Sequence, residues 1–150
     1  MNPQDTPFTN IREQHPLPFE FDGSFSWLVD QPMQTDDLIA QCTATELPDQ
    51  LAVARRAAAT AGVNLPSAFT TFLKSNVRQK YVRSATGCHL DLAESLLPIL
   101  DGYLLRFLLD SQGCAFWYLY LNHDGSDHCV VILYEYFDAD DMDYEIDEIG

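Results

Sequence analysis

The sequence predicts a single α+β domain with a central, mostly antiparallel sheet flanked by helices. Two observations carry this prediction: apolar residues recur at helical spacing in the first half of the chain, and aromatic and β-branched runs of strand length fill the second half. A length of 150 residues is typical of one domain, and a hydrophobic content of 47% supplies one core. We therefore expect residues 1–150 to form one unit.

The first residues of the chain show the weakest hydrophobic periodicity. Residues 1–22 contain four prolines and no hydrophobic period, which predicts an extended N-terminal arm before a folded core at residues 23–137. Residues 24–29 are mostly apolar and aromatic, and they predict a short strand. Thr35 precedes two aspartates as an N-cap residue does, so a first helix is expected after it.

The clearest helical signal begins at Pro48. An apolar stripe with spacings of three and four residues follows, made of Leu51, Ala54, Ala58 and Ala61. Gly62 ends this pattern, as glycine commonly does at a helix C-terminus. A second helix is expected from Pro66 to Lys74, because proline suits the first helical position. The two helices should therefore be neighbours joined by a short connection.

Three apolar runs predict the main strands of the sheet: residues 103–109, 114–121 and 128–134. Each run is apolar on both faces, which predicts strands covered on both sides. Asp124 and Gly125 form a good turn pair, so the last two runs should form an antiparallel hairpin. Residues 89–100 supply another strand or two, interrupted by Pro98.

The net charge of −15 is unevenly distributed. Residues 55–83 contain six bases and no acid, whereas residues 135–150 contain eight acids and no base. We expect residues 138–150 to form a solvated acidic tail. Phosphate contacts need a basic surface, so direct nucleic-acid binding is disfavoured, whereas a basic protein partner would be attracted. The alternative interpretation is that the acidity only maintains solubility.

Composition also indicates the compartment. No apolar run approaches the roughly 20 residues that span a bilayer, so no membrane association is expected. The N-terminus lacks the basic and apolar order of a signal peptide, which predicts a cytoplasmic protein. The four cysteines lie far apart and are expected to be free thiols, with Cys114 and Cys129 packed in the core.

Two possible metal sites fail on spacing. Ligand-type residues crowd one predicted turn: His123, Asp124, Asp127, His128 and Cys129. They lack the recognisable spacing of a structural zinc site, and the turn itself explains Asp124. The acids after Asp138 do not fit a calcium loop, because Met142 and Asp143 occupy its fifth and sixth positions. We expect no metal and no cofactor.

No pattern in the chain predicts catalysis. Cys114 could in principle pair with His89 or His128 as a thiol hydrolase, but no nucleophile motif surrounds it. The glycines are scattered, and no phosphate-binding loop occurs. The protein is therefore expected not to be an enzyme.

The most distinctive segment spans residues 107–121, where a polar turn separates two apolar runs. In a structural interpretation, Asp110 and Gln112 satisfy backbone groups of the turn while Trp117 anchors the core. In a functional interpretation, the same residues line a binding cleft at the end of the strands. Both interpretations stay open at this point.

This segment also carries a family resemblance. A Leu65-Pro66 helix, then Phe107-Leu-x-Asp110 followed by Gln112, then Trp117-Tyr-Leu-Tyr-Leu and a glycine-containing hairpin, resembles the SUKH superfamily over roughly residues 47–134. The family includes bacterial immunity proteins and a yeast cell-wall assembly regulator. One departure is that Asn76 is followed by Val77, whereas members often have Asn-Gly there. The resemblance implies an α+β fold with a central sheet flanked by helices, and binding without catalysis.

The resemblance leads to a functional hypothesis. It implies a bacterial immunity protein that neutralises a toxin, often a nuclease. A regulatory or scaffolding interaction module is the alternative, and a small hydrolase without a recognisable motif is a third. The gene neighbourhood would distinguish the first two, and the oligomeric state stays open. The expected partner-binding residues are Asp110, Gln112, Trp117, Asp138, Asp140, Asp141 and Asp143.

Overall fold

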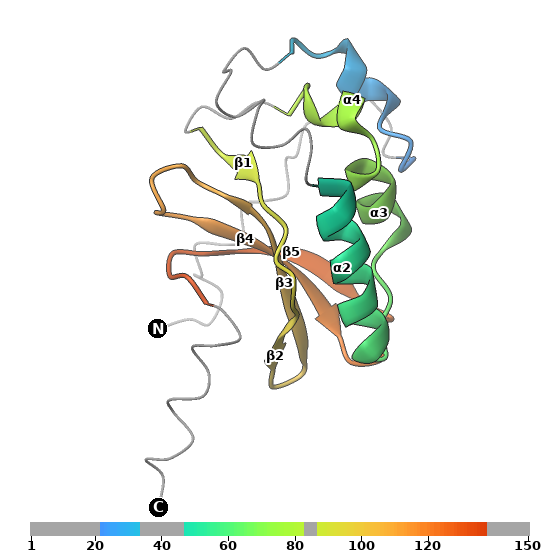
Figure 1. Cartoon of the computed structure of the whole chain (residues 1–150), viewed down its shortest axis with the longest axis vertical. Helices are drawn as coiled ribbons and strands as arrows, with labels where there is room; N and C mark the ends of the chain where they lie inside the picture. Colours follow the sequence, from blue (N-terminus) through green and yellow to red (C-terminus); the bar gives the residue numbers. More distant parts are fainter. Residues whose placement is uncertain (1–21, 34–46, 83–86, 138–150) are drawn as a thin grey trace, which may run out of the picture.

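The computed structural model of the chain describes residues 22–33, 47–82 and 87–137. It has an α+β architecture in which α2 and α3 stand beside a five-stranded antiparallel sheet (Figure 1). The fold class predicted from the sequence is therefore confirmed. The expected arm over residues 1–21, the helix after Thr35 and the acidic tail over residues 138–150 lie outside the described residues.

The strand predicted at residues 24–29 is wrong, because this segment forms the 3₁₀ helix η1 (Ser26–Asp30). Local turn chemistry explains the difference. Gly23 and Phe25 have left-handed backbone angles, with φ of 76° and 59°. The Asp22 carboxylate accepts a hydrogen bond from the Ser24 N–H at 2.8 Å, which bends the chain before the helix begins.

The helix α2 (Leu47–Thr60) follows the predicted stripe. Its residues Leu51, Ala54 and Ala58 are buried. Gly62 has φ of 77°, its N–H donates to the Ala59 carbonyl at 3.1 Å, and the N–H of Val63 donates to the Ala58 carbonyl at 3.0 Å. These two bonds are those of a Schellman motif, so the predicted glycine terminator of this helix is confirmed.

The second predicted helix is present as α3 (Ser67–Leu73), which Pro66 precedes as the N-cap residue. A short helix, α4 (Asn76–Gln79), follows after a cap in which the Ser75 hydroxyl accepts from the Arg78 N–H. The sequence analysis did not predict α4. Four residues give too little apolar period to recognise a helix from sequence.

The sheet contains β1 (His89–Leu90), β2 (Leu97–Ile99), β3 (Gly102–Leu109), β4 (Phe116–Asn122) and β5 (His128–Leu133). The strands run in the order β1-β3-β4-β5, and β2 also pairs with β3. All pairings are antiparallel, so the three predicted runs and the last hairpin are confirmed. Pro98 lies inside β2 rather than ending it. Proline is tolerated there because β3 is the one described strand that pairs with β2.

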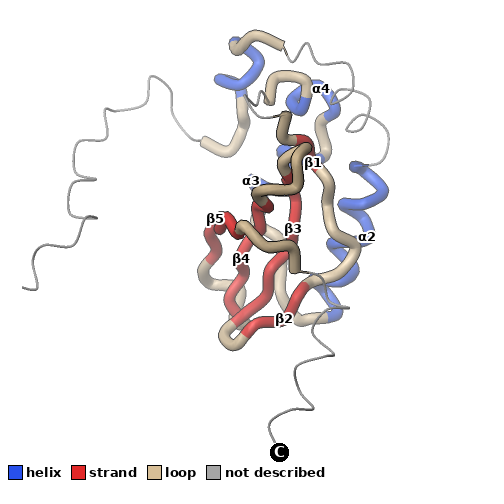
Figure 2. Tube along the Cα trace, turned by 90° about the vertical axis from the view of Figure 1, so that its left-hand side faces the viewer, coloured by secondary structure: helices blue, strands red, loops and turns tan. Residues whose placement is uncertain are grey.

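The prediction that every main strand is covered on both faces is wrong for β5. Four of its six residues are exposed, and the described sheet ends at this strand (Figure 2). Cys114 and Cys129 are likewise exposed free thiols, so their expected place in the core is also wrong. An apolar run has the same composition at the centre of a sheet and at its edge, so composition alone did not separate the two cases.

Two hydrophobic clusters stabilise the fold, one on each face of the sheet. The helix-side cluster joins α2 and α3 to Leu105, Leu119 and Leu121. The opposite cluster is built on Leu97, Leu104, Phe116 and Tyr118. Trp117 is only partly buried and belongs to neither set of described core residues. The expectation that Trp117 anchors the core is therefore wrong, and its neighbour Tyr118 has that role.

The alanines of α2 yield a first testable prediction. Ala54 is completely buried against the sheet, whereas Ala52 is exposed on the same helix. Ala54→Leu is expected to lower the free energy of unfolding by about 1–3 kcal/mol, because extra carbons in a close-packed core force strain. Ala52→Leu is the matched control and should change it by less than about 0.5 kcal/mol. Equal effects in urea denaturation would contradict this packing.

Candidate functional site

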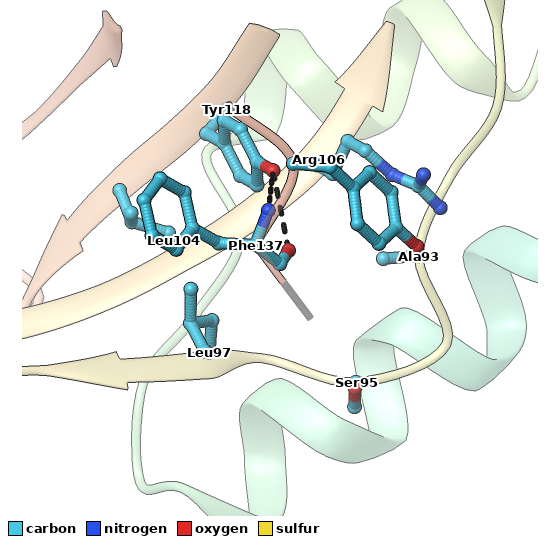
Figure 3. Close-up of a pocket in the computed structure, with 8 residues that line it drawn as sticks. Ala93, Ser95, Leu97, Leu104, Arg106, Tyr118 and Phe137 are labelled. Carbon is cyan, nitrogen blue, oxygen red and sulfur yellow. Dashed lines mark hydrogen bonds between the residues drawn. The ribbon is translucent and has the colours of Figure 1, made fainter. Parts of the chain in front are cut away.

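A short segment after β5 covers part of the sheet face opposite the helices. Residues 134–137, which we call the strap, cross in front of β4 and β3 (Figure 2). The Tyr118 hydroxyl donates to the Phe137 carbonyl at 3.2 Å and accepts from the Phe137 N–H at 3.1 Å (Figure 3). The rings of Tyr136 and Phe116 meet edge to face at 5.3 Å between centroids. The strap is thus fixed by two hydrogen bonds between its Phe137 backbone and the Tyr118 hydroxyl, and by an aromatic contact.

Arg106 connects the strap to the loop before β2. Its guanidinium lies 4.9 Å from the centroid of the Tyr136 ring, and its Nη2 lies 3.2 Å from Asp91 Oδ2. The partly open hollow between Arg106, the strap and β2 has a volume of about 10 Å³ (Figure 3). Such a cavity holds about one water molecule. It is too small for an organic substrate.

A larger hollow of about 490 Å³ lies between η1, α3 and the chain after α4. The described residues that line it are Phe25, Trp27, Leu28, Gln31, Pro32, Phe72, Tyr81 and Val82. This lining contains no carboxylate, imidazole, thiol or aliphatic hydroxyl. Among these described residues, the hydroxyl that lines the hollow is the phenol of Tyr81.

Two of the ligand-type residues around the turn between β4 and β5, Asp124 and Asp127, accept hydrogen bonds from backbone groups of the turn. Asp124 Oδ1 accepts from the Ser126 N–H at 2.8 Å, and Asn122 Oδ1 accepts from the Asp127 N–H at 3.0 Å. Hydrogen bonds from the Ser126 side chain and backbone lower the pKa of the Asp124 carboxyl. Among the residues that the structure describes, no three or more His, Cys, Asp or Glu side chains are grouped to hold a metal.

Asp110 and Gln112 lie in the turn between β3 and β4. Asp110 is buried: its N–H donates to the Ala115 carbonyl at 2.9 Å, and its Oδ2 accepts from the Cys114 N–H at 3.4 Å. Its Oδ1 has no partner among the described residues. The side chain of Gln112 is exposed. The position of Asp110 agrees with the interpretation of this residue as a turn residue.

Trp117 lies on β4, the strand that pairs with β5. It pairs across the sheet with Ile132, while the next residues along the two strands that share its face, Leu119 and Val130, also pair. Leu119 belongs to the helix-side cluster, so Trp117, Val130 and Ile132 point to the helix side. Of the expected partner-binding residues, the structure thus brings Trp117 beside β5. Asp138, Asp140, Asp141 and Asp143 lie outside the described residues.

The last strand of the described sheet, β5, carries exposed apolar side chains, and we call this strand together with Tyr134 the β5 edge. Val130 and Ile132 are 57% and 49% exposed, and Tyr134, which follows the strand, is 80% exposed. The sequence analysis missed these residues because their run is as apolar as the buried runs. The one signal that could have found them is position: β5 is the last strand predicted before the acidic end of the chain.

Acidic residues flank the β5 edge at both ends. Asp124 and Asp127 are exposed in the turn before β5, and Glu135 is exposed just after it. The strand itself contains no acid, lysine, arginine or proline. The β5 edge is therefore an apolar stretch between two negatively charged ends.

The described helices include none that is long and apolar enough to cross a membrane. Comparisons of the chain with protein-family models, curated proteins and solved structures find no match.

Proposed function

We propose that this chain is a non-catalytic protein-binding domain that binds a basic protein partner at the β5 edge. The observation that carries the proposal is the exposed apolar pair Val130 and Ile132 between acidic ends. Apolar side chains at the centre of an interface gain free energy when water leaves them, whereas charges at the rim select the partner. The domain is proposed to act in the cytoplasm.

The charge of the whole chain supports the same proposal. A net charge of −15 creates a long-range field that attracts a cationic partner before contact. Asp124, Asp127 and Glu135 place three of these negative charges beside the strand. Association with a basic partner should therefore be fast and salt-dependent.

The SUKH resemblance makes this partner more specific. Proteins that bind nucleic acid carry basic surfaces, so a nuclease toxin has the charge that the β5 edge would select. The proposed role is accordingly that of an immunity protein that neutralises such a toxin. A toxin gene next to the gene for this chain would support the role, whereas housekeeping neighbours would favour a regulatory or scaffolding module.

The second testable prediction concerns the association rate. The experiment captures the product of the adjacent gene and follows its binding by stopped flow across a salt series. The triple variant Asp124→Asn, Asp127→Asn and Glu135→Gln is expected to associate about tenfold more slowly at low salt and with a flatter salt dependence. Neutralising Asp138, Asp140, Asp141 and Asp143 should act in the same direction.

The control removes the same number of charges from exposed acids on other elements: Asp30→Asn, Asp49→Asn and Glu94→Gln. This control has the same net charge as the triple variant but keeps the acids beside β5. Its association rate should therefore fall less than that of the triple variant. An acidic partner would refute the electrostatic mechanism. So would an association rate that changes neither with salt nor with the substitutions. Turnover of a small molecule by the purified chain would refute the non-catalytic function.

A further inference from the structure

We propose that the partner docks by adding one of its own extended segments to the sheet, as a further strand paired with β5. This inference rests on the proposed function and specifies how the partner binds. Strand addition combines main-chain hydrogen bonds, which give affinity, with side-chain contacts at alternate positions, which give specificity.

The hydrogen-bond register shows which backbone groups of β5 are available. The Asn122 N–H donates to the Asp127 carbonyl at 3.2 Å, so these residues form a hydrogen-bonded pair. Because such pairs alternate along an antiparallel ladder, Val131 faces β4 with its backbone groups, whereas Val130 and Ile132 face away. The bond from Asp110 N–H to the Ala115 carbonyl fixes the same alternation independently through β3 and β4.

Asp127 satisfies the first outward group of the strand. The His128 N–H, which also faces away from β4 in this register, donates to Asp127 Oδ1 at 2.9 Å. The backbone groups of Val130 and Ile132 are left facing the side on which the described sheet has no further strand. These same two residues carry the exposed apolar side chains of the β5 edge.

Within the part of the chain that the structure describes, β5 has none of the sequence features that block pairing. Natural edge strands are blocked by lysine, proline, inward-pointing charge or a bulge. The strand contains no lysine, proline or charged residue, and its six-residue register with β4 is continuous. An apolar, unprotected edge of this kind is a template for another strand.

Charge favours a basic partner segment over two other segments that could pair with β5: a second copy of the chain, and residues 1–22 of the same chain. A second copy would pair antiparallel with β5 and bring the Asp127 end of one chain against the Glu135 end of the other, so acids would face acids. Residues 1–22 of this chain contain four acids, one arginine and four prolines, so they carry the same sign of charge and lack N–H donors at several positions. A segment with basic ends avoids both costs.

The chemistry of the partner segment follows from these features. It should be extended, with alternating β-branched or apolar residues that contact Val130, Ile132 and Trp117, and with lysine or arginine at both ends. The segment should have no proline at the positions where a backbone N–H would face β5.

The test uses the full chain and synthetic peptides of about ten residues, which is long enough to cover a strand of typical length. The probe alternates threonine and valine between pairs of lysines, and a control peptide has glutamates in place of the lysines. Two further peptides carry N-methyl groups on the valines or on the threonines. The lysine peptide should bind at least about tenfold more tightly than the glutamate peptide, and one N-methylated isomer should lose binding while the other keeps it.

Protein variants test the same contact from the other side. Val130→Pro removes an outward N–H without removing a bond to β4, and it should weaken peptide binding about tenfold or more. Val130→Thr keeps the N–H and the β-branched shape, and should bind within about threefold of the parent chain. If Val130→Pro fails to fold, the two N-methylated peptides still decide the question on the unchanged protein.

Amide hydrogen exchange on the free chain identifies the occupant. The Val130 and Ile132 amides should exchange faster than the Val131 amide, and should slow when the lysine peptide binds. Slow exchange of Val130 and Ile132 in a free monomer would show that the chain covers its own edge, and would overturn the proposal. A dimer that Val130→Pro dissociates would overturn it in favour of a second copy.

The outcomes also separate this inference from the proposed function. If the captured basic partner binds Val130→Pro as well as the parent chain, strand addition is wrong and the protein-binding function stands. If neither a basic partner nor the lysine peptide binds, both are wrong.

Discussion

Tyr118→Ala is expected to lower the free energy of unfolding by about 3–5 kcal/mol, the range typical of deleting a fully buried aromatic side chain. Tyr118 is only 1% exposed and belongs to the cluster on the sheet face opposite the helices. Its removal leaves a cavity and also deletes both hydrogen bonds that hold Phe137 of the strap. Chemical denaturation followed by circular dichroism measures the loss.

Two matched variants separate the contributions to this effect. Tyr118→Phe keeps the ring and removes the hydroxyl, so it should cost about 1–2 kcal/mol and loosen the strap specifically. Trp117→Ala should cost less than Tyr118→Ala, because Trp117 is partly exposed and belongs to neither described cluster. A larger loss from Trp117→Ala than from Tyr118→Ala would show that the two residues have been assigned the wrong roles.

Gly102→Ala is expected to cost about 3 kcal/mol, at the upper end of the range for overpacking, because the obstacle is backbone. A Cβ at this position would lie 2.2 Å from the Leu121 carbonyl oxygen and 3.0 Å from Asn122 Cα. Both atoms belong to β4, the strand with which β3 shares its longest pairing. The strands must therefore move apart at the start of β3.

Gly113→Ala is the control for this substitution. Gly113 has open space around it but a left-handed φ of 69°, so alanine there should cost about 1–2 kcal/mol through backbone strain alone. Thermal unfolding of the two variants compares a steric clash with a conformational cost. If Gly102→Ala were no more damaging than Gly113→Ala, β3 and β4 could not approach as closely at Gly102 as the structure has them.

The Tyr118→Phe variant also bears on the proposed interface. The position of β5 depends on β4, and β4 is held by β3 on one side and by the Tyr118 contact with the strap on one face. Tyr118→Phe should thus leave β5 paired while changing the segment that joins it to the acidic end of the chain. Peptide binding that survives Tyr118→Phe and is lost in Val130→Pro would assign recognition to the β5 edge rather than to the strap.

The sequence by itself determined the elements whose signal is local and repeated. The stripe from Leu51 to Ala58 specifies α2, because residues three and four apart share one helix face. Gly62 specifies its end, since a left-handed residue closes the last turn most easily as glycine. The Asp124-Gly125 pair between two apolar runs likewise specifies the hairpin of β4 and β5.

The tertiary structure alone decided which apolar residues are covered. β4 has apolar residues on both faces, so the alternation of its sequence could not show whether Trp117 or Tyr118 is more deeply buried. Tyr118 is the more buried of the two because the strap and the cluster opposite the helices pack against it. The run of β5 resembles that of β4 in composition, yet β4 has strands on both sides and β5 has one described neighbour. The physical reason is that burial is a property of the neighbours a strand acquires, whereas its own sequence sets only its preference for an extended, apolar conformation.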